Sequence, residues 1–124
     1  EYFLEKYNAP VVFITHYPSV KRPFYAMDDP EDTNYTLSFD MLLNGLEVTT
    51  GGQRIHDYEM QVEKMKKRGM DITDFEDYLT MHKYGMPPHG GMGLGLERIV
   101  QNILGLDNIK KATAFPRDRD RLRP

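Results

Sequence analysis

Apolar and polar residues follow patterns along this chain that predict strands in its first part and helices further on. Residues 9–18 (APVVFITHYP) form a β-branched and aromatic run bounded by prolines, which predicts a buried strand. Residues 19–27 are expected to be a second extended piece, because Pro23 disfavours a helix just before it. The acidic, turn-rich stretch 28–35 is interpreted as a surface loop.

The clearest expected element is a hairpin over residues 36–52 (TLSFDMLLNGLEVTTGG). Asn44-Gly45 separates its two apolar stretches, and this dipeptide is typical of two-residue turns because both positions need a positive φ. Counting outward from that turn places Asp40 and Glu47 on one face, with α-carbons roughly 7–8 Å apart. Two carboxylates so placed can share a hard cation, or can simply lie on the solvated side of a sheet. Spacing alone leaves both interpretations open.

Helical periodicity takes over in the next part of the chain. Residues 58–68 carry apolar side chains at helical spacing, and Gly69 is a suitable helix stop. Thr73 and Glu76 have the spacing of a capping box, which predicts a second helix that ends near Gly85.

Residues 90–105 (GGMGLGLERIVQNILG) combine a glycine-rich strand with a last helix. An apolar stripe on this helix is expected to be buried, and it consists of Leu96, Ile99, Val100 and Ile103. Strands joined by a hairpin, then helices, then one strand and helix predict an α+β fold with an antiparallel sheet flanked by helices.

The glycines of this run have two possible explanations. Gly91, Gly93 and Gly95 could allow close packing of a helix on a strand, or could leave room for a flat ligand. Their spacing is not that of the dinucleotide-binding G-x-G-x-x-G motif. Arg98 in the first helical turn supplies a planar cation suited to a phosphate or to stacking on a base.

Composition narrows the function classes only moderately. The 124 residues suffice for one domain, and no apolar run is long enough to span a bilayer, so a cytoplasmic protein without membrane contact is expected. The absence of cysteine excludes disulfides and cysteine-ligated zinc. A net charge of −3 gives no overall attraction to nucleic acid, although residues 115–124 are locally basic.

Four segments of the chain, taken in their sequence order, resemble motifs of the class II aminoacyl-tRNA synthetases. Within that class they are most similar to the archaeal-type branch of the aspartyl and asparaginyl subgroup. GMGLGLERIV is similar to motif 3 of that class, and FDMLLNGLEVTTGGQRIHDYE is similar to the segment that precedes it in the aspartyl enzymes. KYGMPPHGG and FPRDRDRLRP match the same subgroup. Residues 1–124 are thereby expected to be the C-terminal portion of a catalytic domain, with motif 3 at 90–105 and no anticodon-binding domain.

The resemblance implies an ATP site. Arg98 would be the catalytic residue, lying against the adenine and contacting the γ-phosphate. Glu47 would also contact ATP, and the floor of the site would be formed by Gly91, Gly93 and Gly95.

The resemblance also implies a magnesium site and an aspartate site. Asp40 and Glu47 would hold magnesium on the ATP phosphates, joined by the hydroxyl of Thr50, which stands where serine is more usual. Arg54 would pair with the side-chain carboxylate of aspartate in a bidentate geometry that lysine could not reproduce.

The activity implied is ATP-dependent activation of aspartate and its ligation to tRNA, with ATP and magnesium as cofactors. The complete enzyme would be a homodimer that binds tRNA. The motifs that complete its active site would precede Glu1, so the 124-residue chain alone is expected to be inactive. Two alternatives remain at this point: a synthetase-like paralogue that activates an amino acid for amide formation without tRNA, and a non-catalytic binding module.

One conflict between the pattern and the resemblance gives a geometric prediction. Regular alternation along the strand from Glu47 sends Arg54 to the opposite face, whereas the resemblance requires both side chains in one pocket. We therefore expect an irregular backbone at Gly51 or Gly52, where an extra residue would re-aim Arg54.

Overall fold

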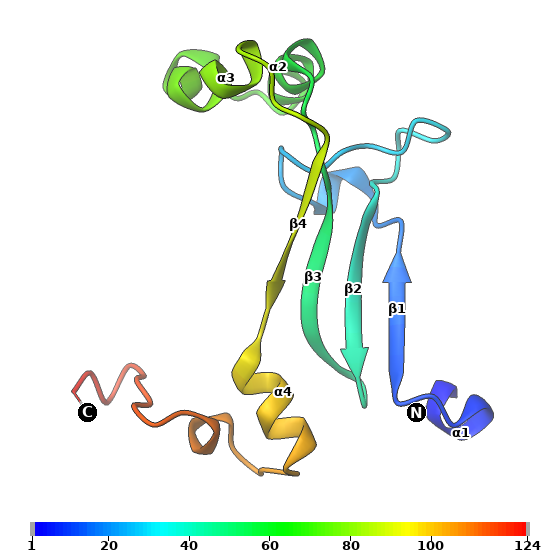
Figure 1. Ribbon diagram of the computed structural model, residues 1–124, viewed down its shortest axis with the longest axis vertical. Helices are drawn as coiled ribbons and strands as arrows, with labels where there is room; N and C mark the ends of the chain where they lie inside the picture. Colours follow the sequence, from blue (N-terminus) through cyan, green and yellow to red (C-terminus); the bar gives the residue numbers. More distant parts are fainter. Residues whose placement is uncertain (1, 124) are drawn as a thin grey trace. The chain divides into compact units, whose positions relative to one another are not determined.

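The computed structural model describes residues 2–123, and its elements follow the order seen in Figure 1. The strands are β1 (Val11–Thr15), β2 (Ser38–Leu43), β3 (Leu46–Arg54) and β4 (His89–Leu94). They form one antiparallel sheet in the order β1-β2-β3-β4. The helices are α1 (Tyr2–Tyr7), α2 (Tyr58–Lys67), α3 (Glu76–Lys83) and α4 (Leu96–Ile103). The predicted α+β class with an antiparallel sheet is confirmed.

The chain divides into two compact units. In the described residues, the first unit consists of 2–14, 40–50 and 93–123, and the second of 15–39 and 51–92. The second unit contains α2 and α3, which lie side by side in Figure 1, and most of the buried apolar residues: Ala26, Ile55, Met65 and Leu79. No helix between residues 2 and 123 combines the length and the apolar character that crossing a membrane requires.

The two helices of the second unit begin by different devices. α2 follows Asp57, whose carboxylate accepts the backbone N–H of Met60, as expected of an N-cap. The expected capping box is wrong, because Thr73 lies inside a short 3-10 helix, Ile72–Phe75, that Asp71 caps. α3 then begins at Glu76 without a side-chain cap, since the 3-10 turn already leads into it.

Burial departs from the sequence pattern in two places. β1 was expected to be buried, but only Val12 among its residues is even half-buried. The expected buried stripe of α4 is also wrong, because none of its residues is buried and Leu96 and Ile103 are 62% and 71% exposed. The apolar pattern marks faces suited to burial, whereas nothing between residues 2 and 123 covers these faces fully.

The stretch 19–27 also differs from the expected extended piece. Ser19–Lys21 form a 3-10 helix, whereas Arg22, directly before Pro23, has the extended backbone that the proline favours, and Ala26 forms an antiparallel bridge to Arg54. A proline therefore restricted one residue here, and the residues before it were free to turn.

The hairpin has the predicted turn but not the predicted regularity. Asn44 and Gly45 join β2 to β3 with φ values of +48° and +83°. Counting outward from this turn places Leu37 opposite Gly52, yet the Leu37 carbonyl accepts the backbone N–H of Gln53 at 2.9 Å. β3 therefore contains one more residue than its partner, which is the definition of a β-bulge.

The bulge lies at Val48–Thr49. These consecutive side chains are 2% and 3% exposed, although neighbours on a regular strand point to opposite faces. The hydroxyl of Thr50 donates to the Glu47 carboxylate at 3.1 Å, and a regular strand would keep these two side chains on opposite faces. The extra residue must therefore lie between them.

The predicted location of the irregularity, Gly51 or Gly52, is thus wrong. Neither glycine has a φ in the left-handed region. Both are needed for close approach instead, because a Cβ atom would be 2.8 Å from the Phe39 ring at Gly51 and 2.8 Å from Ser38 at Gly52.

Candidate functional site

The bulge brings together two oxygen-bearing side chains in the first unit. It places the Thr50 hydroxyl against the Glu47 carboxylate, and Asp40, 6% exposed on β2, shares the face of Glu47 by register from the turn. These are hard oxygen ligands of the kind that magnesium prefers. No group of three or more His, Cys, Asp or Glu side chains could hold a metal among the described residues. The set nevertheless fits magnesium, which commonly binds one or two carboxylates together with water and substrate phosphates.

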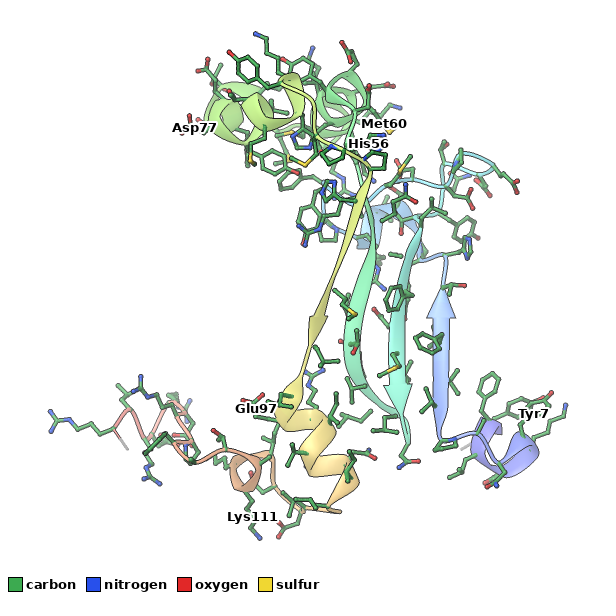
Figure 2. All side chains as sticks on the ribbon, in the orientation of Figure 1. Tyr7, His56, Met60, Asp77, Glu97 and Lys111 are labelled. Atoms are coloured by element: carbon green, nitrogen blue, oxygen red, sulfur yellow. The ribbon has the colours of Figure 1, made fainter. Side chains whose placement is uncertain are left out.

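Arg98 lies against the same glutamate. Its guanidinium donates to the Glu47 carbonyl at 2.8 Å and is 3.6 Å from a Glu47 carboxylate oxygen. Glu97, labelled in Figure 2, precedes it in the first turn of α4. Both partners of the ion pair are about half exposed, so solvent weakens the attraction and the pair is worth about 0–1 kcal/mol. The guanidinium can therefore exchange this carboxylate for a phosphate at little cost.

The three predicted glycines, Gly91 and Gly93 on β4 and Gly95 directly before α4, differ in which side chains cover them. A Cβ atom at Gly95 would be 3.3 Å from the Arg98 side chain, and at Gly91 it would be 2.8 Å from the Arg54 guanidinium. At Gly93 the nearest atom would be the Thr50 carbonyl oxygen at 4.0 Å. Among the described residues, Gly93 alone of the three presents an open surface on which a flat ligand could lie.

Arg54 has its own surroundings in the second unit. Its guanidinium carbon is 5.1 Å from the centre of the Tyr25 ring, and its guanidinium group covers Gly91. Burial raises the pKa of Tyr78, and the nearby positive charge of Arg54 opposes that shift. Tyr78 therefore stays a neutral phenol at physiological pH, able to donate a hydrogen bond beside the guanidinium.

Sequence reasoning missed these two tyrosines as neighbours of Arg54. Tyr25 is brought there by pairing between distant segments, in which the Ile55 N–H donates to the Tyr25 carbonyl at 2.9 Å and Ala26 bridges to Arg54. No local sequence pattern predicts such a contact between distant segments. The only available signal was the position of Tyr25 just after Pro23, in a segment bordered by turns.

The predicted site residues fall into both units. Asp40, Glu47, Thr50, Gly93, Gly95 and Arg98 belong to the first unit, whereas Arg54 and Gly91 belong to the second. The expected pocket shared by Arg54, Asp40 and Glu47 therefore stays a prediction.

Comparison with known proteins gives the class. The family described as "tRNA synthetases class II (D, K and N)" matches residues 1–119, and this chain belongs to it. The chain is 52% identical over 124 residues to the "Aspartate--tRNA(Asp/Asn) ligase" of Thermus thermophilus. That match covers all of this chain and 29% of the relative, so the chain spans less than a third of its length.

Solved structures agree with this assignment. The aspartyl-tRNA synthetase of Entamoeba histolytica superposes with a TM-score of 0.93 at 42% identity, over 99% of this chain and 25% of that one. The asparaginyl-tRNA synthetase of Pyrococcus horikoshii, solved with asparaginyl-adenylate, gives a TM-score of 0.83 at 40% identity over 92% and 27% of the two chains. The resemblance to class II synthetases and the predicted fold are therefore confirmed.

Proposed function

We propose that this chain is the C-terminal portion of the catalytic domain of an aspartate-tRNA ligase, with motif 3 at residues 90–105. The observation that carries the proposal is the arrangement around Glu47, where Arg98, the Thr50 hydroxyl and the open backbone of Gly93 meet in one unit. An oxygen-ligand pair, a weakly ion-paired arginine and an uncovered glycine suit a nucleoside triphosphate better than a packing interface.

In the proposed reaction, the α-carboxylate of aspartate attacks the α-phosphorus of ATP, which forms aspartyl-adenylate and releases pyrophosphate. The aspartyl group then passes to the terminal ribose of tRNA as an ester, and AMP leaves. Such catalysis consists mainly of positioning and of stabilising charge on the phosphate oxygens. The groups in this chain would supply part of that stabilisation.

Each residue of the first unit has a role in this proposal. Arg98 gives up its weak pairing with Glu47 and binds the adenine and γ-phosphate of ATP, while Gly93 forms the floor. Asp40, Glu47 and Thr50 would hold magnesium, which when bound neutralises charge on the phosphates. The 3.1 Å contact between Thr50 and Glu47 supports threonine as a third oxygen ligand in place of serine.

Arg54 is the proposed aspartate-binding residue. A guanidinium flat against Gly91 presents its outer N–H groups in a plane, and a carboxylate can accept two of them at once. Asparagine offers one acceptor oxygen and an amide donor that would face the guanidinium, so this site favours aspartate over asparagine. The complete enzyme is proposed to be a cytoplasmic homodimer that uses aspartate, ATP and tRNA.

The test is aspartate-dependent exchange of pyrophosphate into ATP by the full-length synthetase that carries this segment. We expect Arg54→Leu to abolish discrimination for aspartate while the KM for ATP changes little. We expect Arg98→Leu to raise the KM for ATP. A full-length enzyme that activates asparagine as well as aspartate, or an Arg54→Leu variant that still charges aspartate normally, would refute the assignment. The 124-residue chain alone is expected to give no exchange.

A further inference from the structure

Two side chains on α4, one helical turn apart, attach this helix to the hairpin of the first unit. Arg98 donates to the Glu47 carbonyl at 2.8 Å. Four residues later, the Asn102 amide nitrogen donates to the Leu43 carbonyl at 3.0 Å, and its amide oxygen accepts from the Asn44 side chain at 2.8 Å. Residues at i and i+4 lie on the same helix face, so both attachments are made by one side of α4.

These polar contacts matter because they join α4 to the hairpin through side-chain hydrogen bonds. None of its side chains is buried in the described residues, and Ile103, next to Asn102, is 71% exposed. α4 packs against the 3-10 helix Ile109–Ala112, and its side-chain hydrogen bonds to the hairpin set its rotation about its own axis. A rotation of about 20° carries a side-chain tip roughly 6 Å from that axis through about 2 Å.

Such a rotation would misplace Arg98. The first turn of α4 is held by the Gly95 N–H, which donates to the Val48 carbonyl at 2.8 Å. The last helical turn is held to the hairpin by Asn102, which forms hydrogen bonds with Leu43 and Asn44 at the β2–β3 turn. The two ends together define the direction of the helix, and removing the Asn102 bonds leaves only the first turn attached by a hydrogen bond to the hairpin.

We propose that Asn102 is a positioning residue for Arg98: its paired bonds to Leu43 and Asn44 set the rotation of α4 that aims the guanidinium at the nucleotide. This inference rests on the proposed ATP-binding role of Arg98. Asn44 takes part for a second reason, since its positive φ of +48° forms the turn and directs its own amide toward α4.

The test is steady-state pyrophosphate exchange by the full-length synthetase with Asn102→Ala. We expect the KM for ATP to rise about tenfold while the KM for aspartate stays within twofold, because a misplaced arginine weakens nucleotide binding alone. Asn44→Gly is expected to act in the same direction, since glycine keeps the turn conformation but lacks the amide. Together the two substitutions should cost less than the product of their single effects, as expected of groups that share a bond.

Gln101→Ala is the matched control. Gln101 also donates a side-chain amide bond, to the Leu106 carbonyl at 3.2 Å, but makes it at the end of the helix and away from the hairpin. Its loss should lower thermal stability without changing the KM for ATP. If Asn102→Ala behaves like Gln101→Ala, Asn102 is merely structural and the inference is overturned. Should Asn102→Ala fail to fold, Asn44→Gly carries the same test.

Arg98→Ala separates this inference from the proposed function. If Arg98→Ala leaves the KM for ATP unchanged, the proposed role of Arg98 fails, and the inference fails with it. If Arg98→Ala raises the KM for ATP but neither Asn102→Ala nor Asn44→Gly does, the positioning role alone is wrong.

Discussion

The guanidinium of Arg54 lies directly on the backbone of Gly91, where a Cβ atom would be 2.8 Å from a terminal nitrogen and 3.0 Å from the guanidinium carbon. No side chain larger than hydrogen fits beneath the guanidinium in this position. Gly91 is therefore required by the residue proposed to bind aspartate, rather than by the floor of the nucleotide site where the resemblance placed it.

Gly91→Ala is predicted to impair aspartate binding selectively. The added methyl group would push Arg54 off the strand, so we expect the KM for aspartate to rise by about ten- to a hundredfold in the full-length enzyme. Gly93→Ala is the matched control on the same strand, because its methyl group would meet nothing nearer than 4.0 Å. That substitution should leave the KM for aspartate unchanged and raise the KM for ATP. Equal effects of both substitutions on aspartate would contradict the relationship between Gly91 and Arg54.

The sequence predicted the local elements well and the register poorly. Asn44-Gly45 and Gly69 identified the hairpin turn and the end of α2, since these positions need positive φ values that few other residues tolerate. The bulge at Val48–Thr49 carries no such mark. Neither residue is a glycine, and the bulge is detectable only from the bond between Gln53 and the Leu37 carbonyl, the burial of both residues and the contact between Thr50 and Glu47.

The candidate site likewise contains residues whose placement could be predicted from the sequence and residues whose placement could not. Asp40 and Glu47 could be placed on one face by counting, because Asp40 shares a face of β2 with Leu42, and Glu47, opposite Leu42, lies between the turn and the bulge. The neighbours of Arg54 could not be predicted, because Tyr25 and Gly91 reach it from segments distant in the sequence. Side chains placed by one hairpin are within reach of pattern analysis, whereas side chains placed by several segments are not.

The N-cap that Asp71 provides for the 3-10 helix Ile72–Phe75 should be lost at acidic pH. Its carboxylate accepts the backbone N–H of Thr73 at 3.0 Å and the Thr73 hydroxyl at 2.8 Å, and these bonds lower the pKa of Asp71 below its usual 3.8. A folded-state pKa below the unfolded one means that the cap contributes fully above about pH 3.8 and is lost as the pH falls through the lowered value. Carbon-13 titration of the aspartate carboxyl groups should place the Asp71 midpoint below 3.8.

Thr73→Ala provides the control for this titration. It removes the hydroxyl donor but keeps the backbone N–H, so the midpoint of Asp71 should move only part of the way back. An unchanged midpoint would show that the hydroxyl bond plays no part in the lowered pKa.

The isolated 124-residue chain is predicted to associate with itself. β1 lies at the end of the strand order, and large apolar side chains are exposed on it and on α1, including Phe13 at 57% and Tyr7, labelled in Figure 2, at 58%. An unpaired strand edge beside exposed apolar residues favours pairing with another chain. Sedimentation velocity at micromolar concentrations should detect dimers or larger species, which Phe13→Ser should reduce. Val20→Ser, at a residue 85% exposed outside this region, should not, and a compact monomer of the unmodified chain would contradict the prediction.

Two buried threonines should respond in opposite ways to replacement by valine. Thr36 is fully buried and its hydroxyl donates to the Tyr17 carbonyl at 3.0 Å and lies 2.6 Å from the Ser38 hydroxyl. Thr49, in the bulge, is 3% exposed, and its hydroxyl has no hydrogen-bond partner among the described residues.

Thr36→Val would leave a buried carbonyl and hydroxyl with fewer partners, at a cost of about 1–3 kcal/mol, whereas Thr49→Val removes a hydroxyl that is desolvated without compensation. We therefore expect amide hydrogen exchange in the full-length enzyme to show a lower local opening free energy around Thr36→Val and an unchanged or higher one around Thr49→Val. If Thr49→Val destabilises β3 as much as Thr36→Val destabilises its own segment, the Thr49 hydroxyl must have a hydrogen-bond partner, which would contradict the prediction.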